Sequence, residues 1–238
     1  MASSESSMEA HLALYEITLL AAKPMALRAA ILLDIPDIIV IHGGDNPLSV
    51  EQIASHFSDS TNKPAHTEYL FRIMRLLASM GIFKEESTVD HGDTTQYKYG
   101  LTTLSKFLVK NGAQQSCAPI AVAINVKCVV DAYQHLHDSV IDGVHPFTKA
   151  HGMNLFEYMS NNPEPNRIFN EGMASDTGPL MASVVKVYDG FKSFKSVVDV
   201  AGGVGSAISL IVKEYPHIHG INFDLPHVIS TAAPIQGR

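Results

Sequence analysis

Apolar residues dominate the first long segment of the chain, from Glu9 to Ile35. They fall on nearly every side of a helix, and Pro24 interrupts them, so the pattern predicts two helices that meet near Pro24. A helix that is apolar all round is buried from several sides, which favours a partner subunit over the chain's own core as its contact. Residues 1–8 are polar and predict a disordered tail.

The rest of the N-terminal segment predicts two helices and a strand pair. Ser49 and Gln52 form a capping box at the start of one helix. His66–Gly81 has apolar residues at helical spacing and ends on glycine, and Gln96–Leu101 alternates like a strand after a polar loop. Helix, helix and a strand pair with a polar tip predict a winged-helix-like domain over residues 9–112.

A winged helix that binds DNA carries many basic residues on its second helix and wing. Here Arg72 and Arg75 are the bases of that helix, whereas the wing contains Asp90 and Asp93. The whole chain has a formal net charge of −7. A structural role is therefore favoured over DNA binding, and we expect no nucleic-acid partner.

Helical patterns continue through the middle of the chain, where residues 113–195 predict a helical linker and substrate-pocket segment. Asn154–Met159 and Glu164–Met173 predict short helices around Pro163 and Pro165. Asp176–Val187 predicts a further helix.

The pattern changes at Ser196, where a β-α-β unit begins. Val197–Val200 is a β-branched run, and a glycine-rich loop follows it. Ser206–Tyr215 predicts a helix, and Ile221–Asp224 predicts a second strand, parallel to the first with a right-handed crossover. Residues 196–238 therefore predict the start of an incomplete α/β Rossmann-like domain.

The glycine-rich loop lies where a nucleoside would bind. Such a loop brings backbone close to a ligand, and it directs the amides at the start of the next helix toward that ligand. An acidic residue at the end of the following strand can accept hydrogen bonds from ribose hydroxyls. Asp224 lies 19 positions after Gly205, close to the expected spacing.

Composition excludes other classes of function. Cys117 and Cys128 are the two cysteines, and their spacing indicates neither a zinc site nor a disulfide framework. No window of about 18 uninterrupted apolar residues is present, so we expect no membrane partner. The first ten residues lack a signal-peptide pattern, and a cytoplasmic location is expected.

Several blocks of sequence resemble one known family. The blocks are PMALRAAI (Pro24–Ile31), LFRIMRLLASMGIF (Leu70–Phe83), HGMNLFEYM (His151–Met159), NRIFNEGM (Asn166–Met173), VVDVAGGVG (Val197–Gly205) and GINFDLPHVI (Gly220–Ile229). They resemble the plant S-adenosylmethionine-dependent O-methyltransferases of the caffeic-acid, flavonoid and benzylisoquinoline-alkaloid type. The resemblance covers nearly the whole chain and implies a mostly α dimerisation domain followed by the start of a Rossmann-like methyltransferase domain.

The resemblance implies S-adenosylmethionine as cofactor, S-adenosylhomocysteine as product and no metal. The implied cofactor-binding residues are Asp199, Ala201, Gly203, Gly205, Asp224 and Thr177. Asp224 would hold the ribose diol, and the two glycines would pass beneath the methionine part. Ala201 replaces the glycine that is usual in the family's first motif.

The resemblance also implies a pocket for a small aromatic acceptor. Phe169 and Met173 would line it through ring-face and thioether contacts, and Asn125 would lie at its rim. Without the resemblance, Phe169 and Met173 read as a core stripe at i, i+4. Tyr133 stands where the family often has tryptophan, and Pro165 stands where an aromatic residue of the pocket is common, so both departures are expected to reshape the acceptor site.

The family's catalytic histidine belongs to blocks downstream of DLPHVI, so we expect the base to lie beyond residue 238 and the chain to be C-terminally truncated. His227 belongs to the DLPHVI block and is not that base. Two hypotheses follow. The chain is an O-methyltransferase for a plant phenolic or alkaloid, inactive by itself, or a catalytically dead dimerisation partner of a full-length methyltransferase. It would form a homodimer or a heterodimer with a related methyltransferase.

Overall fold

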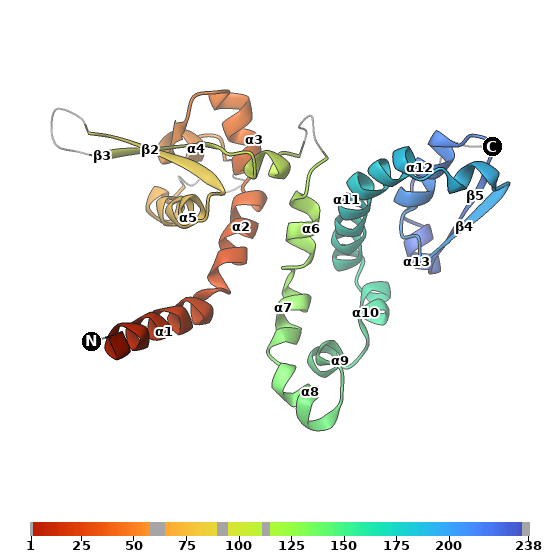
Figure 1. The fold of residues 1–238 in the computed structure, drawn as a ribbon, viewed down its shortest axis with the longest axis horizontal. Helices are drawn as coiled ribbons and strands as arrows, with labels where there is room; N and C mark the ends of the chain where they lie inside the picture. Colours follow the sequence, from red (N-terminus) through yellow and green to blue (C-terminus); the bar gives the residue numbers. More distant parts are fainter. Residues whose placement is uncertain (1, 58–64, 90–94, 111–114, 235–238) are drawn as a thin grey trace. The chain divides into compact units, whose positions relative to one another are not determined.

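The structure is a computed structural model that describes residues 2–57, 65–89, 95–110 and 115–234. It divides the chain into two compact units, Met1–Gln114 and Gln115–Arg238 (Figure 1). The first is mainly helical and the second begins an α/β domain, which confirms the predicted fold class. The segment predicted as a helical linker, residues 113–195, lies almost wholly in the second unit, together with the β-α-β segment.

The first unit contains one short antiparallel sheet among its helices. Its elements are α1 (Ala2–Leu19), α2 (Ala22–Leu32), α3 (Ile35–Ile38), the π-helical turn η1 (Ile39–Gly43), β1 (Leu48–Ser49), α4 (Val50–Ala54), α5 (Thr67–Ser79), β2 (Phe83–Val89), β3 (Thr95–Leu101) and the 3₁₀ turn η2 (Ser105–Leu108).

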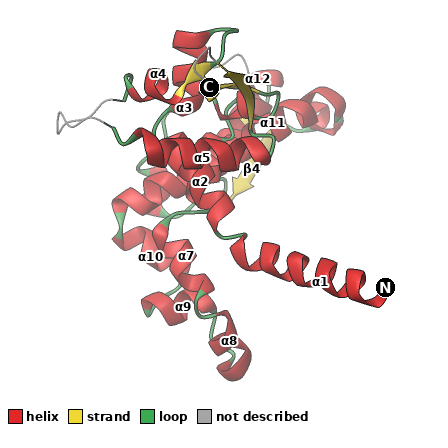
Figure 2. Ribbon diagram, turned by 90° about the vertical axis from the view of Figure 1, so that its left-hand side faces the viewer, coloured by secondary structure: helices red, strands yellow, loops and turns green. Residues whose placement is uncertain are grey.

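The N-terminal segment forms two helices, as predicted, but the break precedes Pro24. α1 ends at Leu19 and α2 begins at Ala22, so Pro24 lies in the first turn of α2, where its missing N–H costs no hydrogen bond. α1 starts at Ala2, so helix stands where the sequence predicts a disordered tail over residues 1–8 (Figure 2). Its apolar side chains are exposed, with Leu12 at 61% and Ile17 at 63%.

Capping and turn residues position the elements of the first unit as predicted. Ser49 Oγ accepts the Gln52 amide at 3.3 Å, and Gln52 Oε1 accepts the Ser49 amide at 2.9 Å, which completes the capping box of α4. Gly81 has a φ of +73°, which lets the chain turn sharply from α5 into β2. The strand order is β1-β3-β2, with Leu48 opposite Tyr99.

In the first unit, polar and ring contacts around a buried tyrosine join α5 to β2 and β3. Tyr99 is fully buried, and its hydroxyl donates to Glu85 Oε2 at 3.0 Å. Burial and the neighbouring Glu85 carboxylate raise the pKa of Tyr99, which therefore stays protonated. Arg75 Nε pairs with the same carboxylate at 3.2 Å, and its guanidinium lies over the Tyr97 ring. The predicted wing tip, with Asp90, His91 and Asp93, lies outside the described residues.

The second unit combines short helices, one long helix and a parallel strand pair. Its elements are α6 (Ala118–Ala123), α7 (Lys127–Tyr133), α8 (Leu136–Asp142), α9 (Pro146–His151), α10 (Leu155–Asn161), α11 (Pro163–Val187), the 3₁₀ turn η3 (Gly190–Ser193), β4 (Ser196–Val200), α12 (Ser206–Glu214), β5 (His219–Phe223) and α13 (Pro226–Ile229).

α11 is one continuous helix of 25 residues, whereas the sequence predicts two helices over 164–173 and 176–187. Pro163 and Pro165 lie in its first turn, where proline is tolerated. Pro179 removes one hydrogen bond from the interior, yet the helix continues because it is packed on both sides of that point. Before Pro179, Gly172 lies against Ala123 of α6, and after it Val185 joins a core cluster with Ile208 and Ile211 of α12.

β4 and β5 lie side by side as a parallel pair, joined by α12 (Figure 1). Asp199 is opposite Asn222, and Val200 is opposite Phe223. Gly220 allows α12 to approach β5, because a Cβ there would lie 2.5 Å from Val212 Cγ1. This is the predicted β-α-β unit, with strand bounds shifted by one or two residues.

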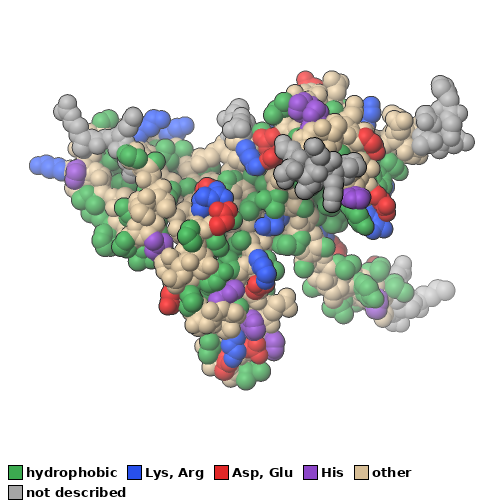
Figure 3. All heavy atoms as spheres, turned by 180° about the vertical axis from the view of Figure 1, so that it is seen from behind, with side chains coloured by type: hydrophobic (Ala, Val, Ile, Leu, Met, Phe, Trp, Pro, Cys, Tyr) green, Lys and Arg blue, Asp and Glu red, His purple; other side chains and the backbone are tan. Residues whose placement is uncertain are grey.

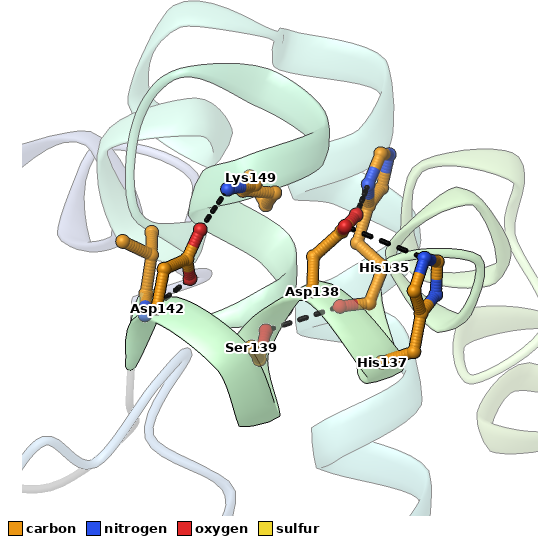
Figure 4. Close-up of polar contacts among 7 residues, drawn as sticks. His135, His137, Asp138, Ser139, Asp142 and Lys149 are labelled. Atoms are coloured by element: carbon orange, nitrogen blue, oxygen red, sulfur yellow. Dashed lines mark hydrogen bonds and ion pairs between the residues drawn. The ribbon is translucent and has the colours of Figure 1, made fainter.

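A group of charged and histidine side chains gathers where α8 meets α9 (Figure 3). Asp138 accepts from His135 Nδ1 at 2.9 Å and contacts His137, while Asp142 pairs with Lys149 of α9 (Figure 4). The hydrogen bond from His135 lowers the pKa of Asp138, and that from Lys149 lowers the pKa of Asp142. These contacts join α8 to its neighbours near the surface.

Neither a metal site nor a membrane-spanning helix is present in the described parts of the chain. No group of three or more His, Cys, Asp or Glu residues there has the arrangement of a metal site. No helix in those parts is both long and apolar enough to span a membrane.

The close contact of α11 with α6 predicts the effect of Gly172→Ala. The new Cβ would lie 2.5 Å from Ala123 Cβ and would force the helices apart. Overpacking costs about 1–3 kcal/mol and the gain in helix propensity offsets about 0.5–1 kcal/mol, so urea unfolding should show a net loss of roughly 1–2 kcal/mol. Ser183→Ala, at an exposed position of the same helix, is the control and should change stability by less than about 0.5 kcal/mol. Equal stability of the Gly172 variant and the wild type would contradict the packing.

Candidate functional site

A pocket of about 520 Å³ lies within the second unit, between α10, α11 and the loops that follow β4 and β5. One part of its wall comes from helices and is mainly apolar, with Phe156, Met159, Phe169 and Met173. The other part comes from the strand ends and is polar, with Asp199, Ala201, Gly202, Gly203 and Asp224. The volume suits a small organic ligand.

The loop after β4 is tied to the end of β5 by side chains of the second strand. The Gly203 amide donates to Asp224 Oδ2 at 2.7 Å, and Asn222 Nδ2 donates to the Gly203 carbonyl at 2.9 Å. Asp224 Oδ1 accepts the Leu225 amide at 2.6 Å. Each carboxylate oxygen of Asp224 keeps a further lone pair, so the residue can still accept hydrogen bonds from a ligand.

Gly202 marks the tightest point of this loop. A Cβ there would lie 2.1 Å from Asn222 Oδ1 and 2.7 Å from Asp199 Cγ, so only glycine fits. The Asp199 Oδ2 and Asn222 Oδ1 atoms beneath it are buried and have no hydrogen-bond partner. Burial raises the pKa of Asp199, and the negative charge of Asp224 adds to the shift. Two unpaired acceptors beside a backbone loop are suited to a ligand that carries donors or positive charge.

The backbone of the loop is left-handed at three positions. Ala201 has a φ of +61°, Gly203 of +61° and Gly205 of +87°. Glycine reaches these angles freely, whereas alanine is strained there. Ala201 is therefore strained by its own conformation, a cost that its position in the motif did not reveal.

One face of α11 forms a stripe along the pocket. Asn166, Asn170, Met173 and Thr177 follow each other at helical spacing, and all four line the pocket. Asn166 is 5% exposed and Asn170 is 7% exposed. Asn166 Oδ1 and Asn170 Nδ2 have no hydrogen-bond partner, and a buried polar atom in that state costs about 1–3 kcal/mol.

Most residues that the sequence singled out lie together in this pocket. The residues that line it are Asp199, Ala201, Gly203, Asp224, Thr177, Phe169 and Met173. Gly205 does not line it; this residue is buried and caps the start of α12. Which ligand atoms these residues bind stays a prediction.

Three residues fall outside the pocket wall. Asn125, predicted at the rim, donates through Nδ2 to the Ala121 carbonyl at 2.9 Å. Tyr133 is 55% exposed, and Pro165 lies in the first turn of α11; neither lines the pocket. The two departures from the family pattern therefore do not shape the pocket wall that the structure describes.

Sequence reasoning missed several residues of the site, among them Asn166, Asn170, Gly202 and Asn222. The period of α11 could have revealed the first two, because they share a face with Met173 and Thr177. Asn222 could have been found as a polar residue that alternates with apolar ones in β5. Gly202 gives no signal beyond the glycine-rich run itself, since its close contacts with Asp199 of β4 and Asn222 of β5 depend on how the two strands pair.

Comparison with known protein families accounts for both units. Residues 15–111 match the O-methyltransferase dimerisation domain, and residues 133–236 match the O-methyltransferase domain. The chain belongs to the O-methyltransferase family. This confirms the resemblance, and the second match contains the whole pocket.

Relatives of known function and structure agree with this family. The chain is 40% identical to caffeic acid 3-O-methyltransferase 2 of Ocimum basilicum over 90% of its own length and 59% of that protein's. The crystal structure of LaPhzM is similar, with a TM-score of 0.74, 30% identity, and coverage of 94% of this chain and 60% of that one. The human N-acetylserotonin methyltransferase complex with S-adenosylmethionine shares the fold, with a TM-score of 0.78, 21% identity, and coverage of 94% and 61%. The chain thus spans about 60% of the length of each of these three proteins.

The strained loop position predicts that Ala201→Gly stabilises the protein. Removing the strain of alanine in the left-handed conformation should raise the free energy of unfolding by about 1–2 kcal/mol. The larger conformational entropy of glycine in the unfolded chain should lower it by about 0.5–1 kcal/mol. Urea unfolding should therefore show a net gain of about 0.5–1 kcal/mol. Ala182→Gly, within the right-handed helix α11, is the matched control and should lose about 1 kcal/mol. A loss at both positions would show that residue 201 is not strained.

Proposed function

We propose that the pocket of the second unit binds S-adenosylmethionine beside an aromatic acceptor, and that the whole protein methylates a phenolic hydroxyl of a plant phenolic or alkaloid. One observation carries the proposal: the Gly203 amide and the Asp224 carboxylate meet in the same pocket as Phe169 and Met173. A nucleoside cradle and an apolar ring pocket thus share one cavity. The relative from Ocimum basilicum, a caffeic acid 3-O-methyltransferase, supports the acceptor class.

The residues of the polar wall fit the cofactor. The free lone pairs of Asp224 can accept the two ribose hydroxyls, and the backbone at Gly203 leaves room for a ligand, because no Cβ is present. The unpaired Asp199 Oδ2 and Asn222 Oδ1 atoms lie beneath the same loop. When bound, S-adenosylmethionine supplies an electrophilic methyl group on a positively charged sulfur.

The apolar wall would hold and orient the acceptor. Phe156 and Phe169 offer ring faces or edges, while Met159 and Met173 offer adaptable thioether contacts. A wall of this kind holds an aromatic ring and excludes water, and holding the reactants together supplies much of the acceleration in such a transfer. A phenol has a pKa near 10 and needs a base, and we assign that proton transfer to no residue of this chain.

We also propose that the first unit forms a dimer through α1. The match to the O-methyltransferase dimerisation domain supports this, as do the exposed apolar residues Leu14 and Ile17. The partner would be a second copy of this chain or a related methyltransferase. If the partner were a full-length relative, the chain would also act as a modulating subunit, which is the second candidate function.

A cytoplasmic location is part of the same proposal. Cys117 and Cys128 are both free, and Cys128 is buried among apolar residues. Free thiols suit a reducing compartment.

Binding of S-adenosylhomocysteine tests the cofactor proposal, with Asp224→Asn as the decisive variant. Loss of charge-assisted hydrogen bonds to the ribose should cost about 1.5–3 kcal/mol, so isothermal titration should show affinity at least about tenfold weaker. Asp189→Asn is the control, because Asp189 is an exposed carboxylate outside the pocket. No heat of binding from folded wild-type protein, or equal affinity in both variants, would refute the cofactor site.

Two acidic substitutions on α1 test whether this helix forms the dimer interface. Leu14→Glu with Ile17→Glu should place unpaired carboxylates in an apolar interface, so light scattering after size exclusion should show the mass fall from dimer to monomer. Val89→Glu replaces another exposed apolar residue of the first unit and should leave the dimer intact. A monomeric wild type, or a variant that stays dimeric, would count against α1. Co-purification with a co-expressed full-length relative would identify a heterodimer.

A further inference from the structure

We infer that Asn166 and Asn170 determine acceptor specificity by binding one hydroxyl of the aromatic acceptor, other than the hydroxyl that reacts. The inference rests on the proposed function, since it assumes that the apolar part of the pocket holds an aromatic ring. It adds two residues, each of which has one side-chain polar atom that is hydrogen-bonded neither within the fold nor to the loop of the cofactor site.

The two side chains are buried, yet their polar atoms are not all paired. Both residues are more than nine-tenths buried and both line the pocket. Asn166 Oδ1 and Asn170 Nδ2 have no hydrogen-bond partner. Buried amides are nearly always paired, so two unpaired ones in a pocket wall point to a ligand. The χ2 torsion of asparagine is soft, so either amide can turn toward that ligand.

The pair offers one acceptor and one donor at close spacing. Residues at i and i+4 of a helix lie on one face, about 6 Å apart along its axis. A hydroxyl group donates one hydrogen bond and accepts others. A hydroxyl that donates to Asn166 Oδ1 and accepts from Asn170 Nδ2 would satisfy both free atoms at once.

The location of Asn166 and Asn170 on α11 favours the acceptor, and not the cofactor, as the ligand that they bind. Phe169, which lies between the two asparagines, packs against the cluster that contains Met159 and Phe147. The part of α11 beyond Thr177 lies near α12, because Met181 and Val185 pack in the cluster that contains Ile208 and Ile211. Asn166 is therefore about 16 Å along the helix axis from Thr177, and it lies on the side of the ring-binding residues.

The test compares acceptors and variants by isothermal titration into the 238-residue chain saturated with S-adenosylhomocysteine. The probes are 3,4-dihydroxycinnamate and its two monohydroxy analogues. In the wild type, the analogue that lacks the bound hydroxyl should bind about tenfold more weakly than the dihydroxy compound. Asn166→Leu and Asn170→Leu should each lower the affinity for the dihydroxy compound by a similar factor. The affinity for the analogue that lacks the bound hydroxyl should not change. Ser183→Ala, on the same helix outside the pocket, should keep the wild-type preference.

Each outcome supports or overturns a defined statement. Leucine is close in shape to asparagine and brings no unpaired amide, so both variants should melt at or above the wild-type temperature and bind S-adenosylhomocysteine equally well. A lower melting temperature with unchanged preference would assign the amides to the fold and overturn the inference. Equal binding of all three probes to the wild type would overturn it without any variant.

Failure of the proposed function gives a different result. If the wild type does not bind S-adenosylhomocysteine, the cofactor site itself is wrong. If it binds S-adenosylhomocysteine but none of the cinnamates, both the acceptor pocket and the role of the asparagines are wrong. If all ligands bind but the Asn166 and Asn170 variants keep the wild-type preference, only the role of the asparagines is wrong.

Discussion

The hydrogen bond from the Gly203 amide to the Asp224 carboxylate connects the two halves of the β-α-β unit at the point where a ligand would lie. It joins a loop that follows the first strand to a residue that ends the second. The loop can reach this carboxylate because Gly202 has no side chain and because Asn222 holds the Gly203 carbonyl from below. The backbone of the loop is thus fixed before a ligand arrives, so less conformational entropy is lost on binding.

Local rules were enough to predict the elements around this bond. The capping box at Ser49 and Gln52 involves atoms three residues apart, and the strand-loop-helix-strand order from Val197 to Asp224 is set by short-range pattern and turn chemistry. The spacing between the glycines and Asp224 follows from the length of one crossover helix. These features need no knowledge of distant contacts, so the sequence alone carries them.

Tertiary packing decided the features that the sequence did not predict. A proline inside a helix normally indicates a break, yet α11 passes through Pro179 because contacts with α6 and α12 hold it on both sides. Asn166 and Asn170 look like solvent-facing positions until neighbouring segments of the fold bury them. The strain at Ala201 depends on a φ angle, and no composition rule reports that angle.

Because α11 is continuous, the distance between the polar and the apolar parts of the pocket wall is fixed. Thr177, near the polar part of the wall, and Phe169, near the apolar part, lie on the same helix. The distance between them is therefore set by the helical rise per residue. Substrate range in this architecture would then change in discrete steps. Moving a polar contact by one turn, about 5.4 Å, would select for a functional group displaced by roughly the distance between para substituents of one benzene ring. Because α11 continues through Pro179, related proteins can differ in the polar residues along this helix while the loop after β4 keeps its structure.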